Sequence, residues 1–126
     1  MSTPLDHAKY INLETFRKDG SGVKTPVWVA PLDGKLVIYT AGTAYKVKRV
    51  RNNPKVRLAE CNGSGKKILG PWHDGTARIL DAAGAAAADA ALNRKYGVLR
   101  RVATFFSTVA GKAKDRVYIE ITLGAS

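Results

Sequence analysis

Two turn signals divide the first forty residues into three segments, and this division constrains the fold more than any other feature. The run 18–22 (KDGSG) is a strong turn signal, and Asp33-Gly34 is typical of a tight hairpin. The segments around these turns carry β-formers and predict an antiparallel meander. The three predicted strands are Tyr10–Arg17, Val23–Pro31 and Lys35–Thr40. Pro26 has no amide donor, so the second strand is expected to lie at a sheet edge or to contain a bulge.

Beyond residue 40 the periodicity predicts helices among the strands. Thr43 can cap a short helix that runs to about residue 53, where Pro54 ends it. Gly97 is a good C-terminal stop and separates two later helices. The remaining predicted elements are strands Lys55–Cys61, Trp72–Leu80 and Arg116–Leu123 and helices Ala82–Tyr96 and Val98–Ala110. We therefore expect one mainly β domain over residues 1–126, with six antiparallel strands closed or partly closed into a barrel, a short helix between strands three and four, and a helical pair before the last strand.

The charge balance indicates what kind of partner the chain attracts. Twenty-one Lys and Arg residues face ten Asp and Glu residues, which gives a net charge of +11. A field of that sign concentrates anions, so nucleic acid, anionic lipid and phosphorylated cofactors are all candidates. The single cysteine, Cys61, cannot form an internal disulfide, and no apolar run approaches the roughly 20 residues that cross a bilayer. Residues 1–10 carry charges where a signal core would lie, so a cytoplasmic location is expected.

The segment Tyr39–Pro54 (YTAGTAYKVKRVRNNP) has the composition of an anion site. A strand ends at Thr40, a short turn follows, and a helix begins, so free amides and the helix dipole face one point. Lys46 lies in the first turn of that helix and Arg49 lies one turn further on. Hydroxyls, amides and cations together suit a phosphate group. The alternative is a solvated basic helix that serves only solubility.

The chain resembles the flavin split barrels related to pyridoxamine-phosphate oxidase, and within them the class of F420-dependent oxidoreductases. Tyr39-Thr40, Lys46 and Asn53-Pro54 fall at the spacing of that superfamily. Further matching segments are Lys9-Tyr10, Thr15-Phe16-Arg17-Lys18-Asp19-Gly20, Thr25-Pro26-Val27-Trp28, Lys46-Val47-Lys48-Arg49, Asp74-Gly75-Thr76-Ala77-Arg78 and Lys95-Tyr96-Gly97. The resemblance implies a split β-barrel, a homodimer with cofactor sites at the subunit interface, and a small-molecule substrate.

The same resemblance implies which residues hold the cofactor. A ring wall and a phosphate site together would comprise Thr25, Pro26, Val27, Trp28, Tyr39, Thr40, Tyr45, Lys46, Lys48 and Arg49. Backbone groups freed near Pro26 would bond the polar side of the ring, and Thr40 and Lys46 would hold the phosphate. The oxidases of the superfamily carry a Ser-Arg pair where this chain has Ala44-Tyr45. That difference favours coenzyme F420, whose anionic tail the surplus cations could receive, over flavin mononucleotide (FMN).

The expected activity is hydride transfer from reduced F420 to an unsaturated small molecule. The cofactor carries this chemistry, so no catalytic residue is assigned, and a proton would come from solvent or Tyr45. His7 and His73 lack metal-ligand spacing, and no metal is expected. Trp28 can be strand core or a wall for the ring, and Trp72 can be core or a cover for the site of a partner subunit. An FMN-binding oxidase or carrier and a basic nucleic-acid-binding module are the alternatives, although the basic run lacks interleaved aromatics.

Overall fold

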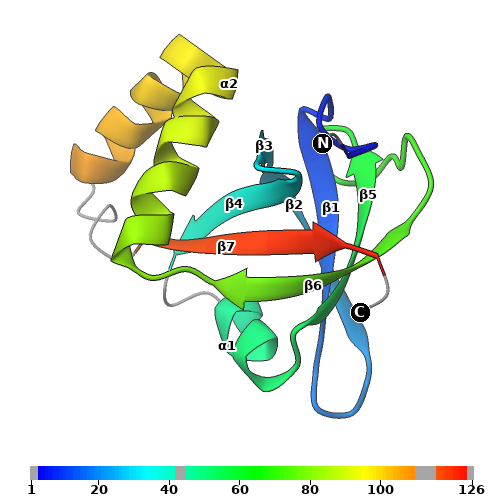
Figure 1. The fold of residues 1–126 in the computed structure, drawn as a ribbon. Helices are drawn as coiled ribbons and strands as arrows, with labels where there is room; N and C mark the ends of the chain where they lie inside the picture. The colour runs from blue at the N-terminus through cyan, green and yellow to red at the C-terminus, as the bar shows by residue number, and fades with distance from the viewer. Residues whose placement is uncertain (1–2, 42–44, 110–115, 125–126) are drawn as a thin grey trace.

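The computed structural model describes residues 3–41, 45–109 and 116–124, which form seven strands and two helices (Figure 1). The elements are β1 (Tyr10–Phe16), β2 (Gly22–Trp28), β3 (Ala30–Leu32), β4 (Lys35–Ala41), α1 (Tyr45–Asn52), β5 (Lys55–Cys61), β6 (His73–Ile79), α2 (Ala82–Val109) and β7 (Arg116–Leu123). The predicted hairpin at Asp33-Gly34 is confirmed, with both residues at positive φ (53° and 78°) as such a turn requires.

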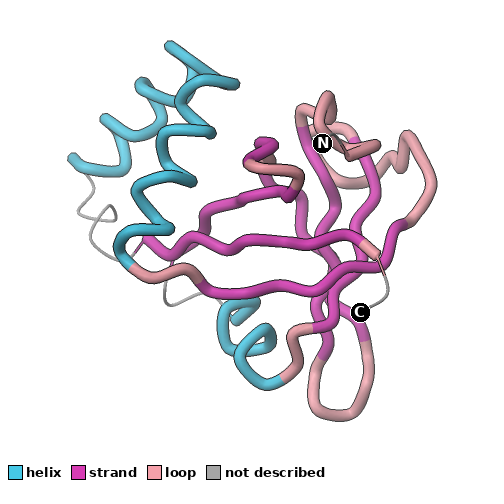
Figure 2. The backbone as a smooth tube through the Cα atoms, in the orientation of Figure 1, coloured by secondary structure: helices cyan, strands magenta, loops and turns pink. Residues whose placement is uncertain are grey.

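All seven strands belong to one antiparallel sheet in the order β2-β1-β5-β6-β7-β4-β3. β2 and β3 are separated in the chain by Val29 alone, yet they lie at opposite edges of this sheet. A single residue can join the two edges only because the sheet curls until they approach each other, as Figure 2 shows. We call the line along which β2 approaches β4 the seam. Trp28 and Tyr39 meet across it, with ring centroids 6.4 Å apart.

The curl explains why the predicted strand Val23–Pro31 is wrong as a single element. The chain leaves β2 after Trp28 and starts β3 at Ala30, so the sheet has seven strands where six were expected. Pro26 lies opposite Asn12 of β1, and β1 is the only described strand that pairs with β2. The edge position predicted from the missing proline donor is therefore confirmed.

The inside of the curled sheet is the main hydrophobic core. Alternate residues of each strand point into it, as the two-residue period of a strand requires. Each fully buried aliphatic side chain of this kind contributes roughly 1.5–3 kcal/mol. The largest are Ile11, Leu13, Leu36, Ile38, Leu58, Ile119 and Ile121. A second cluster lies on the outer face, where α2 covers β3, β4 and β7 with Ala88, Ala91 and Leu92.

The two helices occupy different sides of the sheet (Figure 1). α1 closes one end of the barrel with Val47 and Val50, which are both buried. In α2 the helical backbone continues through Gly97, so the predicted helix end there is wrong, although the ribbon bends between its yellow and orange parts. The predicted last helical residue, Ala110, lies outside the described residues. Among the residues described, no helix is long and apolar enough to span a membrane.

Candidate functional site

A hollow of about 280 Å³ lies at the seam, between the edge strand β2 and the start of α1. Its walls come from both sides of the seam and from the loop after β5. They are Tyr10, Pro26, Val27, Trp28, Tyr39, Lys46 and Gly63. Five of the ten predicted site residues therefore meet in one hollow, although they come from three elements. The split between β2 and β3 creates this hollow, because it leaves β2 unpaired where the barrel closes.

The aromatic walls of the seam hollow form a chain of ring contacts. Trp28 meets Tyr39 edge to face, with an interplanar angle of 67°. Tyr39 in turn lies 6.1 Å from Tyr118 of β7, centroid to centroid. Such contacts hold the rings in place, so a planar ligand would meet a fixed aromatic wall.

Lys46 supplies the positive charge of the hollow. Its Nζ donates a hydrogen bond of 3.0 Å to Thr40 Oγ1 at the end of β4, and Thr40 itself is 8% exposed. Burial lowers the pKa of the Lys46 ammonium, and the nearby charge of Arg49 lowers it further. Among the described residues, Lys46 forms no ion pair with a carboxylate. The pair of Thr40 and Lys46 therefore offers a hydroxyl and an uncompensated cation at one point, which suits a phosphate.

Arg49 and Lys48 border a neighbouring hollow of about 370 Å³. The Nε of Arg49 donates a 2.6 Å hydrogen bond to Thr15 Oγ1, while Lys48 is exposed. Burial lowers the pKa of Arg49, and the positive charge of Arg17 adds to the effect. The lining of this second hollow is Phe16, Arg17, Lys18, Lys48, Arg49 and Asn52. Four cations and no carboxylate line it, so it attracts anions, and the charge of Arg49 is near enough to act on Lys46 of the seam hollow.

Three of the predicted site residues are not among the residues described as lining either hollow, and of these Thr40 reaches the seam hollow only through its hydrogen bond with Lys46. Thr25 of β2 lies opposite Leu13 and does not line the seam hollow. α1 begins at Tyr45, but the side chain of Tyr45 is outside the described part of the structure, as is the predicted cap Thr43. The proposed proton donor therefore stays a prediction.

Tyr10 and Gly63 line the seam hollow and were missed. The register of the β1–β2 hairpin places Tyr10 opposite Trp28. That register follows from the turn at 18–22, so counting outward from the turn would have found Tyr10. Gly63 lies in the loop after β5, and a side-chain Cβ there would come to 3.5 Å from the Tyr10 ring. Nothing in the sequence of that loop indicates this approach.

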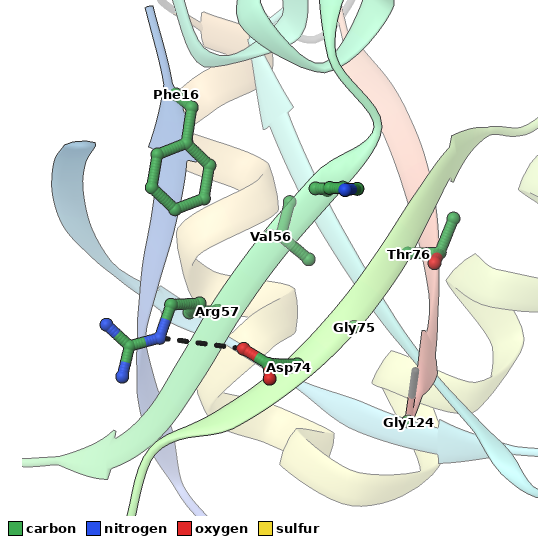
Figure 3. Close-up of a pocket in the computed structure, with 8 residues that line it drawn as sticks. Phe16, Val56, Arg57, Asp74, Gly75, Thr76 and Gly124 are labelled. Atoms are coloured by element: carbon green, nitrogen blue, oxygen red, sulfur yellow. Dashed lines mark ion pairs between the residues drawn. The ribbon is translucent and has the colours of Figure 1, made fainter. Parts of the chain in front are cut away.

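A third hollow, of about 350 Å³, lies on the far side of Phe16 and contains none of the predicted site residues (Figure 3). Its floor is Val56 and Gly75, and its rim carries an ion pair of 3.7 Å between Arg57 Nε and Asp74 Oδ1. Unlike the other two hollows, this one has a carboxylate, Asp74, among its lining residues.

Other residues singled out in the sequence have ordinary structural roles. Trp72 lies between two cations, with Lys24 Nζ and Arg57 Cζ each 5.2 Å from its ring centroid. Cys61 is buried, and burial raises the pKa of its thiol. In the described ranges, no group of three or more His, Cys, Asp or Glu residues is placed to hold a metal ion.

Solved structures of similar fold cover nearly the whole chain. An F420 reductase has a TM-score of 0.59 and 19% identity over 96% of this chain and 90% of its own. An FAD-binding protein from Mesorhizobium loti has a TM-score of 0.63 and 19% identity over 96% and 83%. The heme storage protein HutZ from Vibrio cholerae has a TM-score of 0.69 and 11% identity over 95% and 84%. No family model and no curated protein matches the chain.

These likenesses define the class of fold. The chain is a split β-barrel of the kind found in pyridoxamine-phosphate-oxidase-like proteins, as its sequence predicts. Proteins of this fold include binders of F420, FAD and heme. The ligand of this chain therefore has to be argued from its own seam hollow.

Proposed function

We propose that the protein is an F420-dependent oxidoreductase that holds its cofactor in the seam hollow. One observation carries the proposal. Lys46, a partly buried cation bonded to Thr40 and to no described carboxylate, lies in the same hollow as the aromatic wall of Trp28 and Tyr39. A planar ring bearing a phosphate presents the two complementary features: a face for the wall and an anion for the ammonium.

The protein's own residues would divide the binding between them. Thr40 and Lys46 would hold the phosphate, and Trp28 and Tyr39 would contact the ring. The outer edge of β2 near Pro26 would offer backbone groups to the ring's polar side, because none of the described strands pairs with that edge. When bound in reduced form, F420 supplies a hydride to an unsaturated small molecule lying over its exposed face.

Two features favour F420 over FMN. Ala44-Tyr45 replaces the Ser-Arg pair of the oxidases, which removes two phosphate ligands of a mononucleotide site. The second hollow adds Arg17, Lys18, Lys48 and Arg49 beside the phosphate position. An anionic tail continuing beyond the phosphate would meet these cations, and FMN has no such tail. This attraction should weaken as salt screens it.

A homodimer would complete the pocket. The seam hollow is slightly smaller than the roughly 300–1,000 Å³ of typical ligand sites, so one subunit supplies only part of an enclosure. The loop that carries Gly63 also exposes Ile68 and Leu69, which are 38% and 51% exposed. These exposed apolar side chains would pack against a second copy. Cys61 as a free thiol fits the proposed cytoplasmic location.

The test is a fluorescence titration of the purified protein with F420 and, separately, with FMN, at low and at high salt. We expect tighter binding of F420 and a steeper loss of F420 than of FMN affinity as salt rises. Preference for FMN would replace this proposal by an FMN-binding split barrel. Binding of neither cofactor, together with salt-dependent binding of single-stranded or duplex nucleic acid, would favour the basic nucleic-acid-binding module. A shifted and sharpened Soret band of hemin on mixing with the protein, with no binding of either flavin-type cofactor, would point to heme.

A further inference from the structure

One lysine ammonium on α2 bonds three backbone carbonyls of distant segments. The Nζ of Lys95 donates to the carbonyl oxygens of Asp6 at 3.0 Å, Ala8 at 2.5 Å and Val29 at 2.8 Å. An ammonium carries three N–H donors, so three carbonyls match its capacity. Lys95 thereby joins α2, the segment before β1 and the crossing between β2 and β3. We call this set of bonds the Lys95 clamp.

Two of the three carbonyls lie next to walls of the seam hollow. Val29 directly follows Trp28, and Ala8 stands two residues before Tyr10. Tyr10 and Trp28 face each other across the β1–β2 pair, and both line the hollow. The clamp therefore holds the two chain segments that bring these aromatic side chains to the seam.

The Lys95 clamp requires an ammonium group to be partly removed from water. Burial lowers the pKa of Lys95, although the charges of Asp6 and Glu60 act in the opposite direction. An apolar side chain would anchor α2 without the cost of removing a charge from water. Three directed, charge-assisted hydrogen bonds do what an apolar contact cannot, because they fix where each carbonyl lies.

We propose that Lys95 is a positioning residue for the seam hollow, which sets the place of Trp28 relative to Tyr39. Val29 is the single residue between the two sheet edges, so a bond to its carbonyl holds the chain one residue away from Trp28 and at the start of β3. This inference rests on the proposed function in so far as the hollow holds the cofactor. The placement of Trp28 can be measured without any cofactor.

The experiment follows Trp28 emission in a Trp72→Phe background, where Trp28 is the only tryptophan of the chain. Lys95→Met removes the ammonium and keeps a long apolar side chain. Arg94→Met removes the same charge from the exposed neighbouring residue and is the matched control. All readings are taken well below the thermal midpoint of each variant. A merely structural role would lower the Lys95→Met midpoint and leave the Trp28 emission of the folded protein unchanged.

We expect Lys95→Met to shift the Trp28 emission maximum and to weaken F420 binding at least fivefold, with neither change in Arg94→Met. A folded Lys95→Met protein with unchanged emission and a Kd within twofold would overturn the inference. Should Lys95→Met not fold, Lys95→Leu likewise removes every donor and keeps an apolar side chain, and unchanged emission in that variant overturns the inference equally. If the parent protein binds no F420, the proposed function fails, and the emission comparison alone decides the role of Lys95.

Discussion

Two pairs of basic residues differ in whether an acidic side chain pairs with them: Lys35 and Arg78 of the sheet, and Lys46 and Arg49 of α1. Along the sheet, Arg78 lies 3.1 Å and Lys35 3.5 Å from the same carboxylate oxygen of Glu120. On α1, Lys46 and Arg49 instead donate to threonine hydroxyls, and neither forms an ion pair within the described part of the chain. Arg78 and Lys35 thus share one acid of the protein, whereas Lys46 and Arg49 have no described acidic partner and remain available to an external anion. The net charge of +11 therefore indicates function less well than the location of the cations that no described carboxylate pairs with.

Replacing Lys46 by alanine should have the largest effect on the α1 group. The loss of a charge-assisted hydrogen bond costs roughly 1.5–3 kcal/mol, which corresponds to an increase of about 10- to 150-fold in the Kd for F420. A fluorescence titration measures it. Arg78→Ala removes the same charge from a sheet residue that is paired with Glu120, and it is the control. A Kd for Lys46→Ala within about twofold of wild type would show that the phosphate lies elsewhere.

The pH dependence of binding should follow the lowered pKa of Lys46. Its ammonium form binds anions, so affinity is complete below the folded-state pKa and is lost as the pH rises through it, earlier than for an exposed lysine. The free energy of unfolding of the ligand-free protein has the opposite pH dependence. Because the Lys46 pKa is lower in the folded than in the unfolded chain, the unfolded chain keeps this proton to higher pH, and this group raises the free energy of unfolding as the pH rises. Titrations at increasing alkaline pH test this. The Lys46→Arg variant stays charged, so its loss of F420 affinity should occur at a higher pH than in the wild type. Identical plots of affinity against pH for the two proteins would contradict the assignment of this pH dependence to Lys46.

Trp28→Leu should have a smaller effect than the loss of Lys46. Aromatic contacts contribute roughly 0.5–1.5 kcal/mol beyond burial, so F420 affinity should fall about two- to twelvefold. Trp72→Leu is the control, because Trp72 lies between Lys24 and Arg57 and does not line the seam hollow. Equal losses in the two variants would remove Trp28 from the ring wall.

Arg78→Ala should have the smallest effect. The side chain is 69% exposed, and exposed ion pairs contribute about 0–1 kcal/mol to stability. Urea unfolding should therefore show a loss below about 1 kcal/mol, with the Kd for F420 within about twofold. If Arg78→Ala instead weakens F420 as much as Lys46→Ala, binding depends on overall charge and the contrast between the two groups disappears.

Local patterns in the sequence predicted the elements better than their connections. The strands Lys55–Cys61 and Arg116–Leu123 have the predicted bounds, because regular alternation and flanking turn or loop residues mark them. The run from Val27 to Ala30 has strand-forming residues throughout, so the break at Val29 could not be seen. That break comes from the closing of the sheet, a property of the whole fold. Gly97 gave a false helix end, because glycine is tolerated inside a helix at a modest cost.

The candidate site was predictable where it depends on chain-local motifs. Lys46 and Trp28 belong to short segments with a recognisable resemblance, and the fold brings both to the seam hollow. Gly63 and Lys95 act through contacts with residues far away in the chain. Their roles arise from the way the loop after β5 and α2 pack, and no spacing in the sequence carries that information.

The single-residue link at Val29 has a consequence for the order in which the protein folds. The β1–β2 hairpin is local, but β4 reaches its place only by pairing with β7, in a register that joins Leu36 to Ile121. Contacts between residues so far apart in the chain form slowly, because a long loop must close first. The seam joins β2, which forms early in a local hairpin, to β4, which pairs late with β7. We therefore expect the seam to be among the last parts of the protein to form. A cofactor bound there would meet only the finished barrel, and its binding energy would act almost entirely against unfolding.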